Sequence, residues 1–236
     1  MIINESHIKI EKNARYYSNE PKSREVKNIC FVIHGYGQLA SDFIKEFDFL
    51  DDGNTLIIAP EGLSKFYSKN NAGASWMTRE DRLIEINDYV NFLEKVTDEI
   101  KSTYNISESK KYLLGFSQGV HTAVRFFLNS KTRFDHLILC SSDFPADINF
   151  DLLNTKLKSA AMHFLCGLND RIISTKRFSE STDLLKKNNI EFNDVKFEGG
   201  HEIDSVSINN ILLKKYPQMK NNLRVLLNFI SFGLLS

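Results

Sequence analysis

Short runs of consecutive apolar residues alternate along this chain with longer segments in which apolar residues recur every three or four positions. An unbroken apolar run is typical of a strand buried on both faces, and the three-and-four spacing is typical of an amphipathic helix. The predicted strands cover residues 28–33, 55–59, 111–116, 136–140, 161–166 and 194–197, and the predicted helices cover about 83–102, 120–129, 174–187 and 221–232. This alternation predicts an α/β fold with a mostly parallel central sheet of about eight strands and helices on both faces.

Two segments do not follow this alternation. Residues 1–25 place apolar and polar positions alternately around Lys12 and Asn13, and they are predicted to form N-terminal edge strands. Residues 60–82 form a long loop that leaves the carboxyl end of the predicted strand 55–59, at the edge where ligands bind in open α/β sheets. No linker rich in Pro, Gly or Ser divides the 236 residues, so we expect a single domain over 1–236.

Charge and cysteine content narrow the range of partners. Lysine plus arginine number 30 and aspartate plus glutamate number 30, so no net field attracts the chain to nucleic acid or to an anionic membrane surface. Cys30, Cys140 and Cys166 each lie in an apolar run, where a thiol packs as a small apolar group, and their spacing does not indicate a metal site. The sequence shows no secretory signal and no apolar stretch of about 20 residues, so we expect a cytoplasmic protein without a membrane span.

The strongest chemical signal is the pattern Gly-x-Ser-x-Gly at residues 115–119, with Ser117 at its centre. It stands between a predicted strand and a predicted helix. A nucleophilic serine needs such a sharp turn to expose its hydroxyl, and the flanking glycines let the neighbouring backbone approach closely. Ser117 is therefore the candidate nucleophile.

A serine nucleophile needs a histidine base and an acid that orients the histidine, and in this fold they follow the serine in the order acid, histidine. Asp170 follows a predicted strand, and His201 follows the last predicted strand in the segment Gly-Gly-His-Glu. We expect these two residues to complete a catalytic triad with Ser117. Asp143, which follows an earlier strand, is the alternative acid, and Asp170 would then be a structural turn residue.

Two other histidines lie near these motifs. His34 opens the turn His-Gly-Tyr-Gly, where we expect it to form structural hydrogen bonds on the oxyanion side of the site. His121 follows Ser117 by four residues on the same predicted helix, and we expect its ring to project along the helix.

The oxyanion hole is predicted to combine the backbone N–H groups of Tyr36 and Gln118, which leaves both side chains free to line the pocket. Trp76 in the 60–82 loop is either a wall of the acyl pocket or a residue that packs the loop. Phe144, after the strand that ends at Cys140, is a further candidate for substrate binding. Arg79 either belongs to a solvated helix start or binds an anionic group of the substrate.

The motifs HGYG at 34–37, GFSQG at 115–119, the G-x-x-D turn that ends at Asp170 and GGHEI at 199–203 resemble those of the phospholipase/carboxylesterase family. That family includes the acyl-protein thioesterases, and the likeness extends from about residue 29 to 203. The resemblance implies cleavage of ester or thioester bonds by a Ser-Asp-His triad without a cofactor. The chain departs from the acyl-protein thioesterase pattern in the 60–82 loop and in the N-terminal strands, where substrate choice is expected to differ.

We therefore expect a serine hydrolase of the α/β-hydrolase fold that acts on a small-molecule acyl ester or thioester through an acyl-serine, with no metal or cofactor. A serine peptidase and a non-catalytic binding protein on the same fold are the alternatives. No long insertion follows the strand that ends at Cys140, so a shallow pocket and a preference for short to medium acyl chains are predicted.

Overall fold

The computed structural model describes residues 1–68 and 70–213. The chain divides into two compact units, residues 1–203 and residues 204–236, and each is described by itself. All the residues of the predicted triad and oxyanion hole belong to the first unit. The predicted helix at 221–232 lies outside the described residues. The expectation of a single domain over 1–236 stays a prediction.

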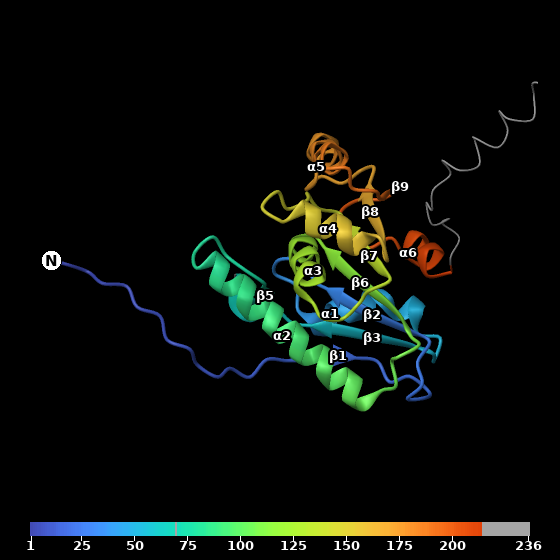
Figure 1. Ribbon diagram of the computed structural model, residues 1–236, viewed down its shortest axis with the longest axis horizontal. Coiled ribbons are helices and arrows are strands. Elements are labelled where there is room, and N and C mark those ends of the chain that lie inside the picture. The colour runs from blue at the N-terminus through green and yellow to red at the C-terminus, as the bar shows by residue number, and fades with distance from the viewer. Residues whose placement is uncertain (69, 214–236) are drawn as a thin grey trace, which may run out of the picture. The chain divides into compact units, whose positions relative to one another are not determined.

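The first unit is built on a seven-stranded sheet with the strand order β1-β3-β2-β6-β7-β8-β9 (Figure 1). Every pair of neighbours is parallel except β1 and β3, which are antiparallel. The strands are β1 (Tyr16–Ser18), β2 (Asn28–Ile33), β3 (Thr55–Pro60), β6 (Lys110–Phe116), β7 (His136–Cys140), β8 (Ala161–Gly167) and β9 (Asn193–Phe197). This architecture confirms the predicted α/β-hydrolase fold, and each apolar run forms the expected strand.

Helices follow the strands and pack on them. The helices of this unit are α1 (Ala40–Phe43), the 3-10 helix η1 (Ile44–Leu50), α2 (Arg82–Thr103), α3 (Gln118–Asn129), α4 (Phe150–Leu157) and α5 (Thr175–Lys187). Helix α3 packs on β2, β6 and β7 and contacts α2 and α4, so these three helices form one layer (Figure 1). Helices α1 and η1 pack against β3.

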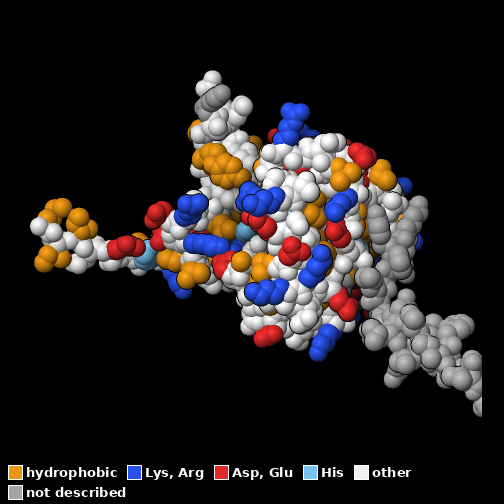
Figure 2. All heavy atoms as spheres, turned by 90° about the horizontal axis from the view of Figure 1, so that it is seen from above, with side chains coloured by type: hydrophobic (Ala, Val, Ile, Leu, Met, Phe, Trp, Pro, Cys, Tyr) orange, Lys and Arg blue, Asp and Glu red, His pale blue; other side chains and the backbone are white. Residues whose placement is uncertain are grey.

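The strands supply most of the core. In β2 and β3 nearly every residue is buried, as expected for strands covered on both faces. Cys30, Cys140 and Cys166 are all buried, which agrees with their predicted packing in the core. Figure 2 shows acidic and basic side chains interspersed over the visible face, in keeping with the equal numbers of the two charges. Among the described helices, none has the length and apolar content that crossing a membrane requires.

The N-terminal segment and the 60–82 loop differ from the prediction. Residues 1–15 form no strand, and only the three residues of β1 pair with the sheet. The loop contains an antiparallel hairpin of β4 (Ser64–Ser68) and β5 (Asn71–Ser75), which form their own two-stranded sheet. The two differences have separate causes. Whether the N-terminal segment pairs with the sheet depends on a partner strand far along the chain, which local periodicity does not reveal. Strands β4 and β5 are neighbours in the sequence, but they carry few large apolar residues and show no alternation.

The described part of the second unit contains α6 (Ser205–Leu212). The Asp204 side chain caps this helix by accepting a hydrogen bond from the N–H of Ser207 at 2.9 Å.

Candidate active site

Ser117 lies in the sharp turn between β6 and α3, as the motif predicted. Its backbone has φ 52° and ψ −121°, a conformation that a non-glycine residue rarely adopts and that is often found at functional sites. A Cβ on Gly119 would overlap the carbonyl oxygens of Ile33 and His34, and a Cβ on Gly115 would overlap the carbonyl oxygen of Gly119. The two glycines are thus required by close backbone approach, and the turn leaves the Ser117 side chain half-buried rather than covered.

Asp170 and His201 form a hydrogen-bonded pair at the ends of β8 and β9. The Asp170 side chain is fully buried, and its Oδ2 lies 2.8 Å from Nδ1 of His201. Its Oδ1 accepts hydrogen bonds from the N–H groups of Ile172 and Ile173, each at 2.8 Å. Because an ionised carboxylate only accepts, Nδ1 of His201 is the donor, and Nε2 of the neutral ring is left as the basic nitrogen.

The turns that carry the acid and the histidine are joined to each other. The N–H of Leu168 donates to the carbonyl of Phe197, and the N–H of Asn169 donates to the carbonyl of Gly199, both at 2.9 Å. A Cβ on Gly167 would overlap the carbonyl oxygens of Gly199 and Gly200, so glycine is required for this close approach. The register of Asp170 against His201 is therefore set by backbone contacts.

The imidazole of His201 lies next to the nucleophile turn. Its ring packs on Phe116, the residue before Ser117, with 4.9 Å between the ring centroids. Strands β6 to β9 are successive parallel neighbours, so the loops that carry Ser117, Asp170 and His201 all leave the same edge of the sheet. The structure thus brings the three predicted triad residues to one end of the sheet.

The turn after β2 approaches Ser117 from the other side. A Cβ on Gly35 would lie 3.1 Å from Cβ of Ser117. The N–H groups of Gly35, Gly37 and Gln38 all donate hydrogen bonds within the protein. Within the part of the chain that the structure describes, the N–H groups of Tyr36 and Gln118 donate to no residue. These are the two donors predicted for the oxyanion hole.

His34 and the 60–82 loop hold this turn in place. His34 is fully buried, its Nε2 accepts from the N–H of Gly62 at 3.0 Å, and its Nδ1 therefore donates to the carbonyl of Gly35 at 2.7 Å. Burial lowers the pKa of His34, which favours the neutral ring that these contacts need. The structure agrees with the hydrogen-bonding role expected for this histidine.

Gln118 and Trp76 belong to the same packing arrangement. The Gln118 Oε1 accepts from the N–H of Trp76 at 3.1 Å, and its Nε2 donates to the carbonyl of Met77 at 3.0 Å, so the Gln118 side chain is not free to line a pocket. Trp76 is 1% exposed, packs against the His34 ring and donates its indole N–H to the His34 carbonyl at 2.9 Å. This placement favours the loop-packing role of Trp76 over the pocket-wall role.

The other residues suggested for substrate contact lie in different surroundings. Phe144 is buried and packs edge-on against Phe164. Arg79 is exposed in the segment before α2. Tyr36 is 63% exposed and stacks on Phe66 of the hairpin, with 4.9 Å between ring centroids. Of these side chains, only Tyr36 and Arg79 present a large exposed surface, and their contact with a substrate stays a prediction.

Asp143, the alternative acid, has other partners than His201. Its Oδ1 lies 2.9 Å from Nε2 of His121, and its Oδ2 accepts from Nη2 of Arg177 at 2.6 Å. The hydrogen bond from His121 and the nearby Arg177 hold the pKa of Asp143 well below its usual range. Sequence reasoning treated His121 and Asp143 separately and missed this cluster, because the three residues are far apart in the chain.

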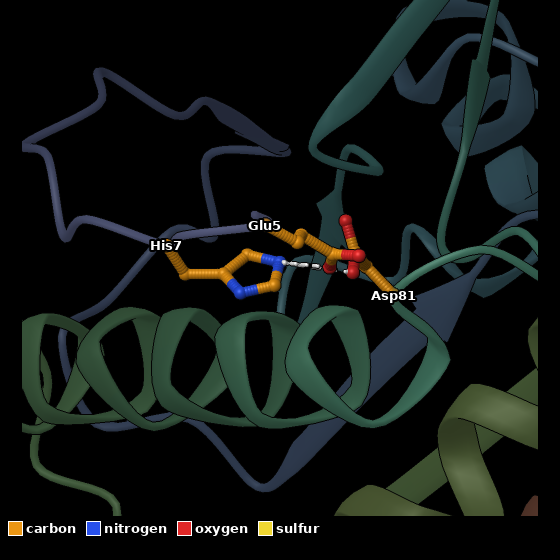
Figure 3. Close-up of side chains that lie close together, drawn as sticks. All are labelled: Glu5, His7 and Asp81. Carbon is orange, nitrogen blue, oxygen red and sulfur yellow. Dashed lines mark hydrogen bonds and ion pairs between the residues drawn. The ribbon is translucent and has the colours of Figure 1, made fainter. Parts of the chain in front are cut away.

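A second group of titratable side chains lies on the surface (Figure 3). Nε2 of His7 is 3.3 Å from Oε1 of Glu5 and 3.2 Å from Oδ1 of Asp81. All three residues are exposed, and one nitrogen faces both carboxylates. This is the arrangement of a solvent-exposed ion pair, which contributes little to stability.

Comparison with known proteins gives one family. Residues 16–214 match the family described as Phospholipase/Carboxylesterase. No curated protein matches the chain. Among solved structures, esterase PE8 superposes with a TM-score of 0.63 at 19% identity, covering 86% of this chain and 99% of that one. The acyl-protein thioesterase 2 of Zea mays gives 0.63 at 17% identity, covering 84% and 96%, and the carboxylesterase of Bacillus cereus gives 0.59 at 16% identity, covering 84% and 91%. The structural likeness is one of fold, and the family match over most of the chain shows that this protein belongs to the phospholipase/carboxylesterase family of α/β hydrolases.

Proposed function

We propose that this protein is a serine hydrolase that cleaves carboxylic-ester or thioester bonds through an acyl-serine on Ser117. The observation that supports this most directly is the buried Asp170–His201 pair, whose hydrogen bonds fix the tautomer of the histidine. A carboxylate with no exposed surface that orients a histidine beside a strained serine turn is an arrangement suited to nucleophilic catalysis. Membership in the family points to esters rather than to another bond class.

The first half of the proposed reaction uses each of these groups once. His201 Nε2 removes the proton from the Ser117 hydroxyl as the oxygen attacks the acyl carbon, and Asp170 stabilises the imidazolium that forms. The N–H groups of Tyr36 and Gln118 stabilise the oxyanion of the tetrahedral intermediate. Collapse of that intermediate breaks the bond to the leaving group, which takes the proton from His201.

The second half repeats the chemistry with water. His201 accepts a proton from a water molecule as the water attacks the acyl-serine, and a second oxyanion forms in the same place. When the ester bond to Ser117 breaks, the proton returns to the serine oxygen and the carboxylic acid leaves. These steps need no group beyond the side chains and backbone amides named here.

The direct test is labelling with a fluorophosphonate, which reacts with a serine that a base activates. We expect one label per chain at Ser117, located by peptide mass spectrometry, and hydrolysis of p-nitrophenyl esters or acyl-thioesters by the same preparation. Ser117→Ala should abolish both. Ser107→Ala, at an exposed serine before β6, is the matched control and should change neither. Label on another residue in the Ser117→Ala protein would refute the assignment.

A further inference from the structure

Three polar side chains form a cluster beside the nucleophile: His121 on α3, Asp143 in the loop after β7 and Arg177 on α5. The 2.9 Å from His121 to Asp143 is the distance of a hydrogen bond, and the 2.6 Å from Asp143 to Arg177 is that of a hydrogen-bonded ion pair. The side chains are 21%, 32% and 53% exposed, in the same order. The cluster therefore lies at the surface and becomes more open toward Arg177.

Several contacts place this cluster next to the proposed nucleophile. His121 follows Ser117 by four residues, which is one helical turn, and such residues are neighbours on a helix surface. The N–H of Ser117 donates to the carbonyl of Cys140 at 3.0 Å, so the end of β7 touches the nucleophile turn three residues before Asp143. Helix α5 begins at Thr175, shortly after Asp170, and Arg177 is in its first turn.

The charges in the cluster leave one group able to bind an anion. Both carboxylate oxygens of Asp143 are already engaged, one by His121 and one by Arg177. Arg177 uses Nη2 for this contact, and its guanidinium has further N–H donors on a side chain that is half exposed. Arg171, exposed in the turn that precedes α5, adds a second positive charge from the same turn as Asp170.

A long alkyl group is a poor fit to such a surface. Covering the ion pairs with methylene groups would remove water from charged atoms without supplying hydrogen bonds, which is unfavourable. A carboxylate, in contrast, matches the planar fork of donors that an arginine presents.

We propose that the His121–Asp143–Arg177 cluster is a specificity site that binds a carboxylate carried by the substrate, through Arg177. The proposal rests on the proposed hydrolase function of Ser117, and it narrows the substrate class to esters or thioesters with an anionic end. Asp143 holds the guanidinium in place, and His121 holds Asp143. Arg177 is the residue that contacts the substrate.

Matched ester pairs test this directly. The p-nitrophenyl hexanoate and the mono-p-nitrophenyl ester of adipic acid differ only in a terminal carboxylate, and the corresponding four-carbon and eight-carbon pairs vary the reach. We expect kcat/KM to be about 10- to 100-fold higher for the anionic member of the best pair, mostly through KM, which is the value of one charge-assisted hydrogen bond. A second arm, phenyl hexanoate against 4-carboxyphenyl hexanoate, shows whether the carboxylate belongs to the acyl group or to the alcohol. A preference below about threefold in both arms overturns the proposal.

Variants of Arg177 and Lys176 distinguish specific binding by Arg177 from a general effect of positive charge at the surface. Arg177→Met should reduce the preference to about one, and Arg177→Lys, which keeps the charge but loses the fork, should restore part of it. Lys176→Met removes the same charge one residue away, from a side chain that is 86% exposed and pairs with Glu180, and should keep the preference. A preference that survives Arg177→Met, or that Lys176→Met lowers equally, contradicts the proposal.

Binding distinguishes failure of this inference from failure of the proposed function. Titration of the Ser117→Ala protein with monomethyl adipate and with methyl hexanoate requires no turnover. If the wild-type protein takes no fluorophosphonate label at Ser117 and hydrolyses no ester or thioester, the hydrolase function is wrong. Tighter binding of monomethyl adipate that Arg177→Met abolishes would then still support the anion site. Equal binding of the two compounds refutes the site whatever the activity.

Discussion

Exchange of Asp170 for asparagine tests the proposed triad, and the structure predicts how the amide will be oriented. Asp170 Oδ1 accepts from two backbone N–H groups, those of Ile172 and Ile173, while Oδ2 accepts from His201. In Asp170→Asn the amide oxygen will keep the two backbone donors, so the amide NH₂ faces Nδ1 of His201. That NH₂ can only donate, so the proton of the neutral ring moves to Nε2, where the base is needed.

The magnitude follows from the cost of the opposite orientation. Turning the amide so that its oxygen faces His201 would leave the N–H groups of Ile172 and Ile173 without an acceptor. The Ile173 contact is buried and costs about 1–3 kcal/mol, and the partly buried Ile172 contact adds less, for about 1–5 kcal/mol in total. The competent tautomer is thus populated at roughly 1 part in 5 to 1 part in 5 × 10³, and the loss of negative charge beside the imidazolium adds to this. The same exchange in another Ser-His-Asp triad lowers turnover by about 10⁴-fold. We expect a loss of about 10³- to 10⁴-fold in kcat for Asp170→Asn.

Asp143→Asn is the matched control, because Asp143 is the other aspartate after a strand of this sheet edge and also hydrogen-bonds a histidine. With a neutral ester such as p-nitrophenyl butyrate, we expect it to lower kcat by less than about tenfold. Circular dichroism should be unchanged in both variants. A loss below tenfold for Asp170→Asn, or the reverse ranking of the two variants, would refute the reasoning and remove Asp170 from the triad.

Three further predictions concern two buried histidines of the sheet and the side chains that support the site. Burial lowers the pKa of His136 to about 4 and that of His163 to about 3. Between these pKa values and pH 6.5, both histidines are therefore protonated in the unfolded chain but neutral in the folded chain. The free energy of unfolding, measured with urea, should therefore be about 4 kcal/mol lower at pH 5 than above pH 6.5. A difference below about 1 kcal/mol would contradict this. Gln118→Leu keeps the backbone N–H of the oxyanion hole but loses the contacts to residues 75–77, so kcat should fall by about tenfold while Ser117 still takes the fluorophosphonate label. Trp76→Ala should lower the free energy of unfolding by about 3–5 kcal/mol, because the residue is 1% exposed, and a change confined to acyl-chain preference would favour the pocket-wall role instead.

The strands and the nucleophile turn could be predicted because their signals are local. In β2, β6 and β8 a continuous apolar run marks a strand that is covered on both faces, and the structure contains each of them within one residue of the predicted ends. The glycines around Ser117 are needed because backbone carbonyls approach them closely, and the Gly-x-Ser-x-Gly pattern contains both of them.

Sequence reasoning missed short elements with weak local signals and one cluster that joins distant segments. Hairpin β4–β5 has the sequences SKFYS and NAGAS, which carry few large apolar residues and give no alternation. Helices α1 and α4 are only 4 and 8 residues long, too short for a repeated apolar face to stand out. The His121–Asp143–Arg177 cluster joins residues that are 22 and 34 positions apart, and no spacing rule connects them.

The 60–82 loop was expected at the edge of the sheet where ligands bind, and its contacts give it a supporting role as well. The N–H of Gly62 and the indole N–H of Trp76 both donate to His34, at its ring and at its carbonyl, and the N–H of Gly37 donates to the carbonyl of Ala74 in β5. These bonds hold the turn that carries the Tyr36 N–H. Donors in an oxyanion hole are effective because they are oriented before the charge develops, so no reorganisation is needed during the reaction. These contacts give the loop a supporting role for the proposed oxyanion turn, and the proposed anion site on α3 and α5 would then carry the choice of substrate.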